Sequence, residues 1–305
     1  MEGVTDVVFR QVIAQAGRPD LFFTEFTNVS SYASEKGRAN ALERFATAPT
    51  DAPIIAQIWG KEPKHFAITC TALKKLGFAG IDINMGCPDR HVNRAGGGAA
   101  MIRTPDLAID CIKNAQKNSN GLPVSVKTRL GYTFVDEWHD WIKLLLKQNL
   151  AMLTVHLRTR KEMSKVPAHF ELIPEIIKLR DEIAPQTKIV FNGDIADRKH
   201  AEKLWQKYPK VDGFMIGRGV FTNPYCFTNH IPNREELMDL LKLHLNLHDK
   251  ACQKYHRSFE PLKHYFKIYI RDFPGATKLR TALMECHDTS AARQVIKNFE
   301  SKNHE

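Results

Sequence analysis

Short runs of apolar and β-branched residues alternate with longer segments in which apolar residues recur every three or four positions. The first pattern is typical of buried strands and the second of amphipathic helices. Their regular alternation over the first three quarters of the chain predicts an α/β fold around a parallel sheet. The seven expected strands are Leu21–Val29, Pro53–Gly60, Gly80–Gly86, Pro123–Gly131, Met152–Thr159, Lys188–Ile195 and Asp212–Gly219.

The helices between these strands have recognisable starts. Pro63 and Pro105 stand where a first helical turn accepts proline, and Thr104 is the expected N-cap of the second of these helices. The expected helices are Val7–Gly17, Lys64–Leu76, Asp106–Asn118, Glu137–Lys147, His169–Ile183 and Arg198–Tyr208.

Strands that are followed by polar turns and then by helices predict a TIM (β/α)8 barrel. A doubly wound open sheet has the same local pattern and stays an alternative. A barrel needs eight strands, whereas the sequence offers seven. Because the chain opens with a loop at Met1–Asp6 and then a helix, we expect the first strand to be missing upstream of Met1.

The pattern changes near Asn223, after which only helices are predicted. We therefore expect a barrel domain over residues 1–228 and an all-α helical domain over residues 229–305. Its expected helices are Asn233–His256, Pro261–Asp272, Gly275–Cys286 and Thr289–Glu300. Aromatic residues at helical spacing are expected in its core, namely Phe259, Tyr265, Phe266 and Tyr269. The histidines of this part, His244, His248, His256 and His264, lack a convincing metal-ligand spacing.

Composition narrows the class of protein. The 305 residues are 43% hydrophobic and 26% charged, values of ordinary globular proteins. The net charge of +10 favours polyanionic partners. No apolar run reaches the roughly 20 residues of a membrane span, so we expect a cytoplasmic protein without membrane contact. The six cysteines are scattered, which predicts reduced thiols and no metal site.

The strongest candidate for chemistry is the segment from Asp82 to Pro88, at the end of a predicted strand. Asn84 and Cys87 would lie at the barrel mouth, where the loops after strands build active sites. A lone cysteine is more often a small buried hydrophobe. The following glycines, at positions 96 to 98, favour the functional reading because such a loop must move or approach a ligand closely.

Other strand ends carry polar groups toward the same mouth. A lysine such as Lys127 within an apolar run is unusual, because a buried amine must be paired or neutral. A solvated lysine on an edge strand is the alternative reading. Glycine-rich turns after the last two strands predict a phosphate site. The candidate positions at these strand ends and turns are Gln57, Lys127, Arg129, His156, Arg158, Asn192, Gly193, Asp194, Gly217 and Arg218.

The motifs MEGVTD, QIWG, NMGCP with GGGAAMI, VKTRLG, TVHLRT, NGDI and IGRG follow one another along the chain. In order and spacing they closely resemble the tRNA-dihydrouridine synthases, from Met1 to about Pro224. The later helices resemble the C-terminal RNA-binding bundle of that family in position and size. Two features depart from the family pattern. The sequence starts at Met1, without the strand and the Ala-Pro that normally precede this methionine, and Leu157 stands where glycine is common.

The resemblance implies an enzyme with tightly bound FMN that uses NADPH to reduce the 5,6 double bond of specific uridines in tRNA. It implies that hydride passes from the flavin to C6 and that Cys87 protonates C5. A thiol near its ordinary pKa of ~8.5 suits that role. The implied cofactor contacts are Met1, Glu2, Gly3, Gln57, Asn84, Lys127, His156, Asn192, Gly193, Asp194, Gly217 and Arg218.

A uracil stacked in folded tRNA must be taken out of the stack, which costs a few kcal/mol, before it can reach a flavin. Basic residues would supply that energy through phosphate contacts. The rim candidates are Arg90, Arg94, Arg129, Arg158, Arg160, Lys161 and Lys165. Those of the helical domain are Lys263, Lys267, Arg271, Lys278 and Arg280, for which a solvated helix face is an equal alternative.

Two other functions stay open. One is a flavin barrel that acts on a free pyrimidine, as dihydroorotate dehydrogenases do. The other is a tRNA-binding protein without catalysis. We expect a monomer.

Overall fold

The computed structural model describes residues 1–255 and 258–301, so the predicted helix end at His256 lies outside the described residues. An eight-stranded parallel sheet forms the centre of the molecule. Its strands are β1 (Phe22–Phe23), β2 (Thr27–Asn28), β3 (Ile54–Trp59), β4 (Gly80–Met85), β5 (Val124–Arg129), β6 (Met152–His156), β7 (Lys188–Asn192) and β8 (Gly213–Met215).

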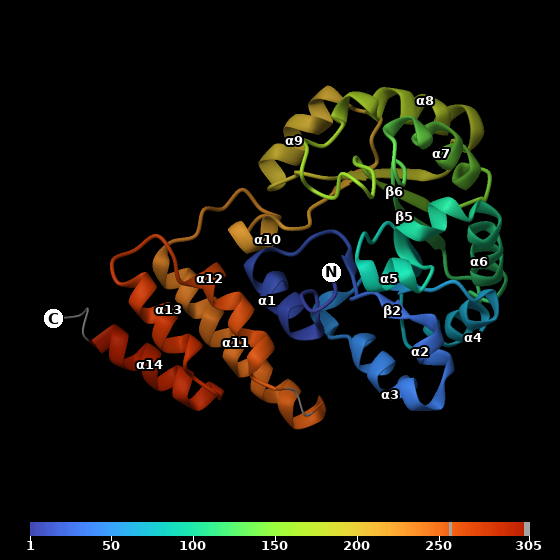
Figure 1. Cartoon of the computed structure of the whole chain (residues 1–305). Helices are drawn as coiled ribbons and strands as arrows, with labels where there is room; N and C mark the ends of the chain where they lie inside the picture. Colours follow the sequence, from blue (N-terminus) through green and yellow to red (C-terminus); the bar gives the residue numbers. More distant parts are fainter. Residues whose placement is uncertain (256–257, 302–305) are drawn as a thin grey trace.

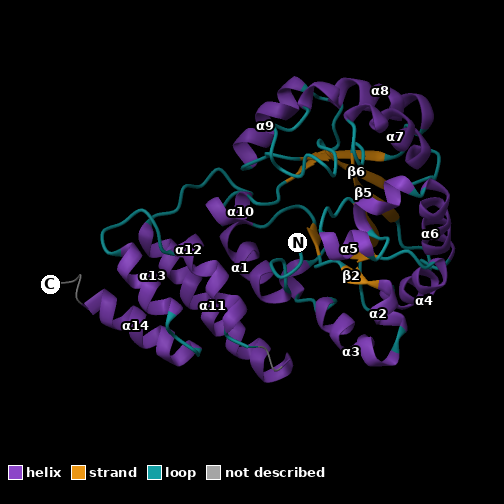
Figure 2. Ribbon diagram, viewed as in Figure 1, coloured by secondary structure: helices purple, strands orange, loops and turns teal. Residues whose placement is uncertain are grey.

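The strands lie in the order β1-β3-β4-β5-β6-β7-β8, and β2 also pairs with β3. Every pairing is parallel. The sheet curls into a half-barrel with helices outside it, and among the described residues no pairing joins β8 to β1 (Figure 2). Sequential parallel strands with helical crossovers confirm the predicted barrel class and exclude the strand order of a doubly wound sheet.

The first predicted strand, Leu21–Val29, is interrupted. Between its halves, the Thr24 hydroxyl donates to the Glu25 carbonyl (2.7 Å) and accepts the Gln57 N–H (3.0 Å). The strand prediction was also wrong at its end, because Val29 begins helix α2 (Val29–Ala33). The last strand ends earlier than predicted, since β8 stops at Met215.

The helices that cover the sheet occupy the predicted positions to within a few residues, and several short or polar ones in the described residues were not predicted. Helix α3 shows why, because only Ala41 of its ten residues is buried and it has no apolar stripe to detect. The confirmed helices are α1 (Val7–Gly17), α4 (Pro63–Leu73), α6 (Pro105–Lys117), α7 (Trp138–Leu146), α8 (Ile173–Ile183) and α9 (Arg198–Lys207). The additional ones are α2, α3 (Glu35–Arg44) and α5 (Arg90–Arg94), and a further turn of helix, α10 (Gly219–Thr222), follows β8.

The C-terminal part is helical, as predicted, and lies against α1 (Figure 1). Its helices are α11 (Arg234–Tyr255), α12 (Phe266–Tyr269), α13 (Ala276–Met284) and α14 (Thr289–Ser301). The predicted helix Pro261–Asp272 is instead a 3₁₀ helix, Glu260–Tyr265, continued by the short α12.

Aromatic packing joins the helical part to the barrel. Phe9 of α1 lies against Tyr265, with ring centroids 4.6 Å apart, and against His244. The His244 ring is buried and its Nδ1 lies 2.8 Å from the Tyr269 hydroxyl. The four aromatic residues expected in this core are all buried, and the apolar core runs without a break from the barrel helices into this part.

Within the described residues, no helix combines the length and the apolar character that crossing a bilayer requires.

Candidate active site at the carboxyl ends of the strands

Strand register places the predicted polar residues on the inner face of the sheet. Residues that pair across neighbouring parallel strands point to the same side, and the helices lie on the other side (Figure 1). The pairings form three polar rows: Gln57, Asp82 and Ser125; Asn84, Lys127 and Thr154; Arg129, His156 and Asn192. Six predicted site residues therefore share one surface.

Hydrogen bonds connect the row of Gln57, Asp82 and Ser125 and extend to Asn84 of the next row. Asn84 Nδ2 donates to Gln57 Oε1 (3.2 Å), and Gln57 Nε2 donates to Asp82 Oδ2 (2.8 Å). The Ser125 hydroxyl donates to the other Asp82 oxygen (2.6 Å). Burial raises the pKa of Asp82. Sequence reasoning missed Asp82 and Ser125 as parts of the site, although a carboxylate within an apolar strand is the same signal that drew attention to Lys127.

Lys127 lies in the middle row with its ammonium group available. Burial, and then the charge of Arg129, lower the pKa of Lys127 to about 8, while Asp82 opposes the shift. Within the described residues the ammonium donates no hydrogen bond. The neighbouring Thr154 Oγ1 and Asn192 Oδ1 are buried without a hydrogen-bond partner. These rows therefore contain hydrogen-bonding groups that have no partner within the described residues.

Cys87 directly follows β4, and its backbone is fixed on both sides. Its N–H donates to Asn84 Oδ1 (2.9 Å), and its carbonyl accepts the N–H of Ala99 (3.0 Å) and Asn93 Nδ2 (2.8 Å). Burial raises the pKa of the Cys87 thiol, so the thiol keeps its proton at neutral pH.

The glycine loop folds back onto this cysteine. Gly98 has φ +58°, and a Cβ there would lie 2.8 Å from the Cys87 carbonyl oxygen. A Cβ added at Gly97 would lie 2.6 Å from the Trp59 ring. The glycines therefore let the loop lie close to Cys87 and its neighbours, and the close approach to a ligand stays a prediction.

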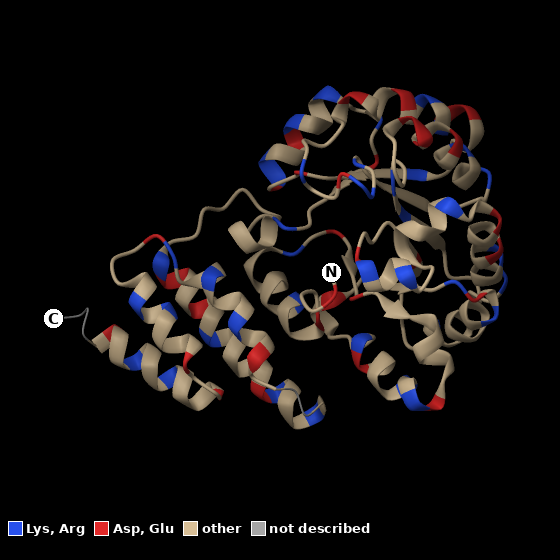
Figure 3. Cartoon of the chain, in the orientation of Figure 1, with Lys and Arg blue, Asp and Glu red and all other residues tan. Residues whose placement is uncertain are grey.

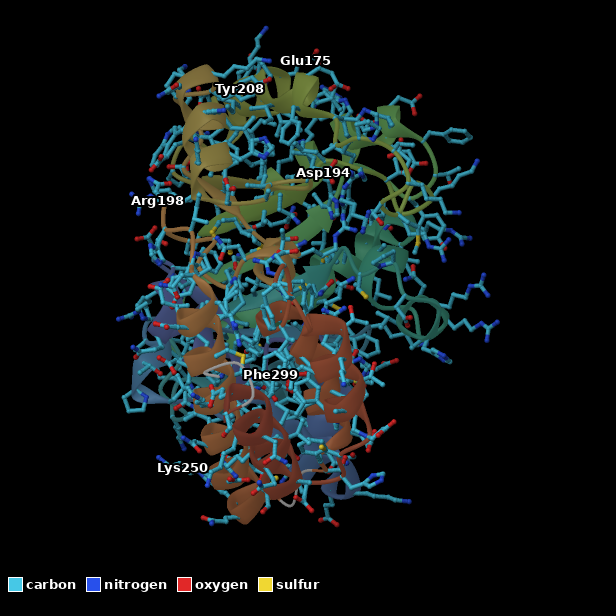
Figure 4. All side chains as sticks on the ribbon, turned by 90° about the vertical axis from the view of Figure 1, so that its left-hand side faces the viewer. Glu175, Asp194, Arg198, Tyr208, Lys250 and Phe299 are labelled. Atoms are coloured by element: carbon cyan, nitrogen blue, oxygen red, sulfur yellow. The ribbon has the colours of Figure 1, made fainter. Side chains whose placement is uncertain are left out.

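Arg158 holds the turn after β7. Its buried guanidinium forms an ion pair with the exposed carboxylate of Asp194 and donates from Nε to the Val166 carbonyl (2.6 Å). The Ala168 N–H also donates to Asp194 (3.0 Å). Burial opposes ionisation, but these donors hold the pKa of Asp194 below its ordinary value. Figure 4 labels Asp194 in the sheet part of the chain, away from Phe299 in the helical part.

His156 adjoins this turn. Burial first, and then the positive charges around it, hold the pKa of His156 far below its ordinary value, so the imidazole is neutral. Gly193 has φ +121°, and a Cβ there would lie 3.2 Å from the His156 ring. The turn between Asn192 and Asp194 is thus packed directly on the imidazole.

The predicted RNA contacts divide into two groups. Arg129 is buried and donates to the carbonyls of Gly86 (2.7 Å), Thr159 (3.0 Å) and Met163 (3.0 Å), and Arg158 is buried as described. Both guanidinium groups therefore fix loops in this structure. Arg160 is half-buried. The other predicted rim cations are exposed, namely Arg90 and Arg94 on α5 and Lys161 and Lys165 after β6, and Arg218 is exposed as well. Figure 3 shows basic positions on α5.

The segment Met1–Val4 forms hydrogen bonds with two residues that are distant in the sequence. The Gly3 N–H donates to Glu25 Oε1 (2.6 Å), and burial raises the pKa of Glu25. The Tyr265 hydroxyl of the helical part donates to the Val4 carbonyl (2.7 Å). Met1 packs partly buried against the core, whereas Glu2 forms an exposed pair with Arg44 (2.7 Å). A Cβ added at Gly3 would meet nothing within 4 Å, and the same is true of Gly217 in the turn after β8.

A half-barrel of parallel strands with a polar inner face at the strand ends defines an α/β-barrel protein. A family model described as dihydrouridine synthase (Dus) matches residues 1–303. The chain belongs to the dihydrouridine synthase family, as its motifs indicated.

Curated relatives match nearly the whole chain. It is 51% identical over 304 residues to the probable tRNA-dihydrouridine synthase 2 of Bacillus subtilis (strain 168), covering 99% of this chain and 93% of that protein. It is 48% identical to the probable tRNA-dihydrouridine synthase of Staphylococcus aureus (strain COL), covering 99% and 92%.

Solved structures resemble the chain less. Morphinone reductase in complex with tetrahydroNAD is 14% identical with a TM-score of 0.49, over 74% of this chain and 81% of that one. The old yellow enzyme homologue from Zymomonas mobilis is 13% identical with a TM-score of 0.47, over 73% and 82%. This likeness is too low to add to the description of the fold.

Proposed function

We propose that the protein is an FMN-dependent tRNA-dihydrouridine synthase that takes electrons from NADPH and reduces the 5,6 double bond of uridines in tRNA. One observation carries the proposal: a protonated thiol, Cys87, stands beside the polar row of Asn84 and Lys127. In a member of this family, that arrangement supplies a proton donor next to a site for a polar ring.

The inner face fits FMN. Lys127 has an uncommitted ammonium, and Thr154 Oγ1 and Asn192 Oδ1 lack partners. Gly3 and Gly217 face open space. Gln57, Asn84, Lys127 and His156 would hold the ring. The phosphate would lie at the turns that contain Asn192, Gly193, Asp194, Gly217 and Arg218, since backbone N–H groups and an exposed guanidinium favour an anion there.

The bound flavin would supply hydride to C6 of the uracil. Cys87 then donates its Sγ proton to C5, and its raised pKa ensures that the proton is present at neutral pH. The positive charge of Arg129 nearby stabilises the thiolate that remains. Lys127 places a cation in the ring site, which favours the reduced, anionic form of a flavin.

The substrate follows from charge and position. The net charge of +10 attracts a polyanion, and the exposed Arg90 and Arg94 adjoin Cys87. In the helical part, Lys263, Lys267 and Arg280 line one pocket of about 380 Å³. We propose that residues 1–228 carry out the chemistry and that residues 229–305 bind the body of the tRNA.

The direct test is spectroscopic. We expect the purified chain to show flavin absorption that NADPH bleaches and that tRNA lacking dihydrouridine restores, while the RNA gains the mass of two hydrogens at each reduced uridine. A flavin-free protein that binds tRNA would instead support a binding role. A flavoprotein that is reoxidised by orotate and not by tRNA would support action on a free pyrimidine.

A further inference from the structure

A cluster of cations surrounds Tyr132 in the loop after β5. The Arg103 guanidinium lies 5.1 Å from the centroid of the Tyr132 ring, and the Arg160 guanidinium lies 5.4 Å from it. Arg103 ends the segment that begins at Cys87, and Arg160 follows β6. Three neighbouring strand-to-helix loops therefore meet at one aromatic ring, and the first of these loops carries the proposed catalytic thiol.

Phe134, two residues further on, points into solvent. Its side chain is 63% exposed, the largest value for a phenylalanine in the described part of the chain, and Lys161 Nζ lies 5.7 Å from its ring centroid. A single exposed apolar side chain needs no explanation. One with a cation at its ring, next to a second aromatic ring that carries two more cations, resembles a nucleotide-binding surface.

The turn that carries Phe134 is fixed before any partner binds. The Glu137 carboxylate accepts the N–H groups of Tyr132 (2.6 Å), Thr133 (3.1 Å) and Phe134 (2.9 Å). The Lys161 N–H donates to the Tyr132 carbonyl (2.9 Å), which joins the turn to the loop after β6. Little ordering would accompany binding, so contacts made by the ring would contribute to affinity almost in full.

We propose that this surface, formed by Tyr132, Phe134, Arg103, Arg160 and Lys161, binds an unpaired nucleotide of the tRNA adjacent to the extruded uridine. The base of this nucleotide stacks on the Phe134 ring, and the phosphates on either side of it contact Arg103, Arg160 and Lys161. The idea rests on the proposed function, because tRNA is the expected partner. The nearby carboxylates are compatible with phosphate binding. Glu137 accepts hydrogen bonds from the turn, and Glu162 accepts one from the Thr159 N–H (2.7 Å). Asp136 is then the exposed acid of the turn.

The test compares two exposed aromatic residues. Phe134→Leu keeps an apolar side chain and removes the ring, Phe134→Trp keeps a stacking ring, and Trp205→Leu removes a 50% exposed ring on the outer helix α9. The dissociation constant of each full-length variant is measured for unmodified tRNA and for a short single-stranded oligouridylate, at one fixed salt concentration. Flavin content and thermal unfolding report whether each variant is folded.

We expect Phe134→Leu to weaken binding of both RNAs about tenfold, which corresponds to the loss of one stacked base. Phe134→Trp should bind as the wild type does, and Trp205→Leu should be unchanged. Lys161→Gln should lower the salt dependence by about one phosphate contact. Unchanged binding by Phe134→Leu, or equal weakening by Trp205→Leu, would overturn the proposal. Because binding is measured without turnover, these outcomes are independent of whether the chain reduces uridine.

Discussion

Gly98 offers the sharpest test of how the glycine loop positions Cys87. Its backbone has φ +58°, and an added Cβ would lie 2.8 Å from both the Cys87 carbonyl oxygen and Val92 Cγ1. An alanine at positive φ costs about 1–2 kcal/mol. Overpacking against a fixed carbonyl adds about 1–3 kcal/mol. Gly98→Ala should therefore lower the free energy of unfolding by about 2–5 kcal/mol.

Gly77 is the matched control, because its φ is +84° and an added Cβ would meet nothing within 4 Å. Gly77→Ala should cost only the backbone part, about 1–2 kcal/mol. Urea unfolding of the two variants separates the contact from the strain. Gly98→Ala should also slow uridine reduction, because the Cys87 carbonyl must move to admit the methyl group. Equal losses of stability in the two variants would refute the argument.

Three further predictions concern charge and contact. The stability of the wild type relative to Lys127→Met should rise between pH 8 and pH 10, measured by urea unfolding, because buried Lys127 with a pKa of about 8 loses its proton while the unfolded chain still binds one. Tyr265→Phe removes the hydrogen bond to the Val4 carbonyl, next to the proposed FMN contacts Met1–Gly3. We expect the dissociation constant for FMN to rise severalfold with the fold intact. Arg158→Met should destabilise the protein by about 2 kcal/mol at neutral pH, because it removes the guanidinium's hydrogen bonds to the Val166 carbonyl and to Asp194. That loss should shrink below about pH 4, as Asp194 becomes protonated in both states.

The sequence predicted those parts of the fold that depend on local patterns. Apolar runs identified the strand positions, and the unusual charge of Lys127 within one run marked a polar position on the inner face of the sheet. The interruption of the strand Leu21–Val29 was not predictable, since it depends on the hydrogen bond between the Thr24 hydroxyl and Gln57 of the neighbouring strand. Local sequence does not encode which groups meet across strands.

The site shows the same division. Residues on strands, such as Asn84 and His156, lie on the inner face because alternation fixes their direction. Arg129 has a long side chain that can reach solvent or backbone, and tertiary contacts turned it toward three carbonyls. Tyr265 bonds to Val4 across 261 positions of sequence, a contact that no spacing or periodicity reveals.

The proposed role of Cys87 as the proton donor in uridine reduction can be tested in the half-reaction that reoxidises the flavin. Reduced, flavin-loaded enzyme is mixed without oxygen with unmodified tRNA, and flavin reoxidation is followed for the wild type and for Cys87→Ser. Serine is a far weaker acid than a thiol, so we predict reoxidation about 10²–10⁴-fold slower, with flavin content and tRNA affinity unchanged. Reoxidation at the wild-type rate by Cys87→Ser would contradict the account.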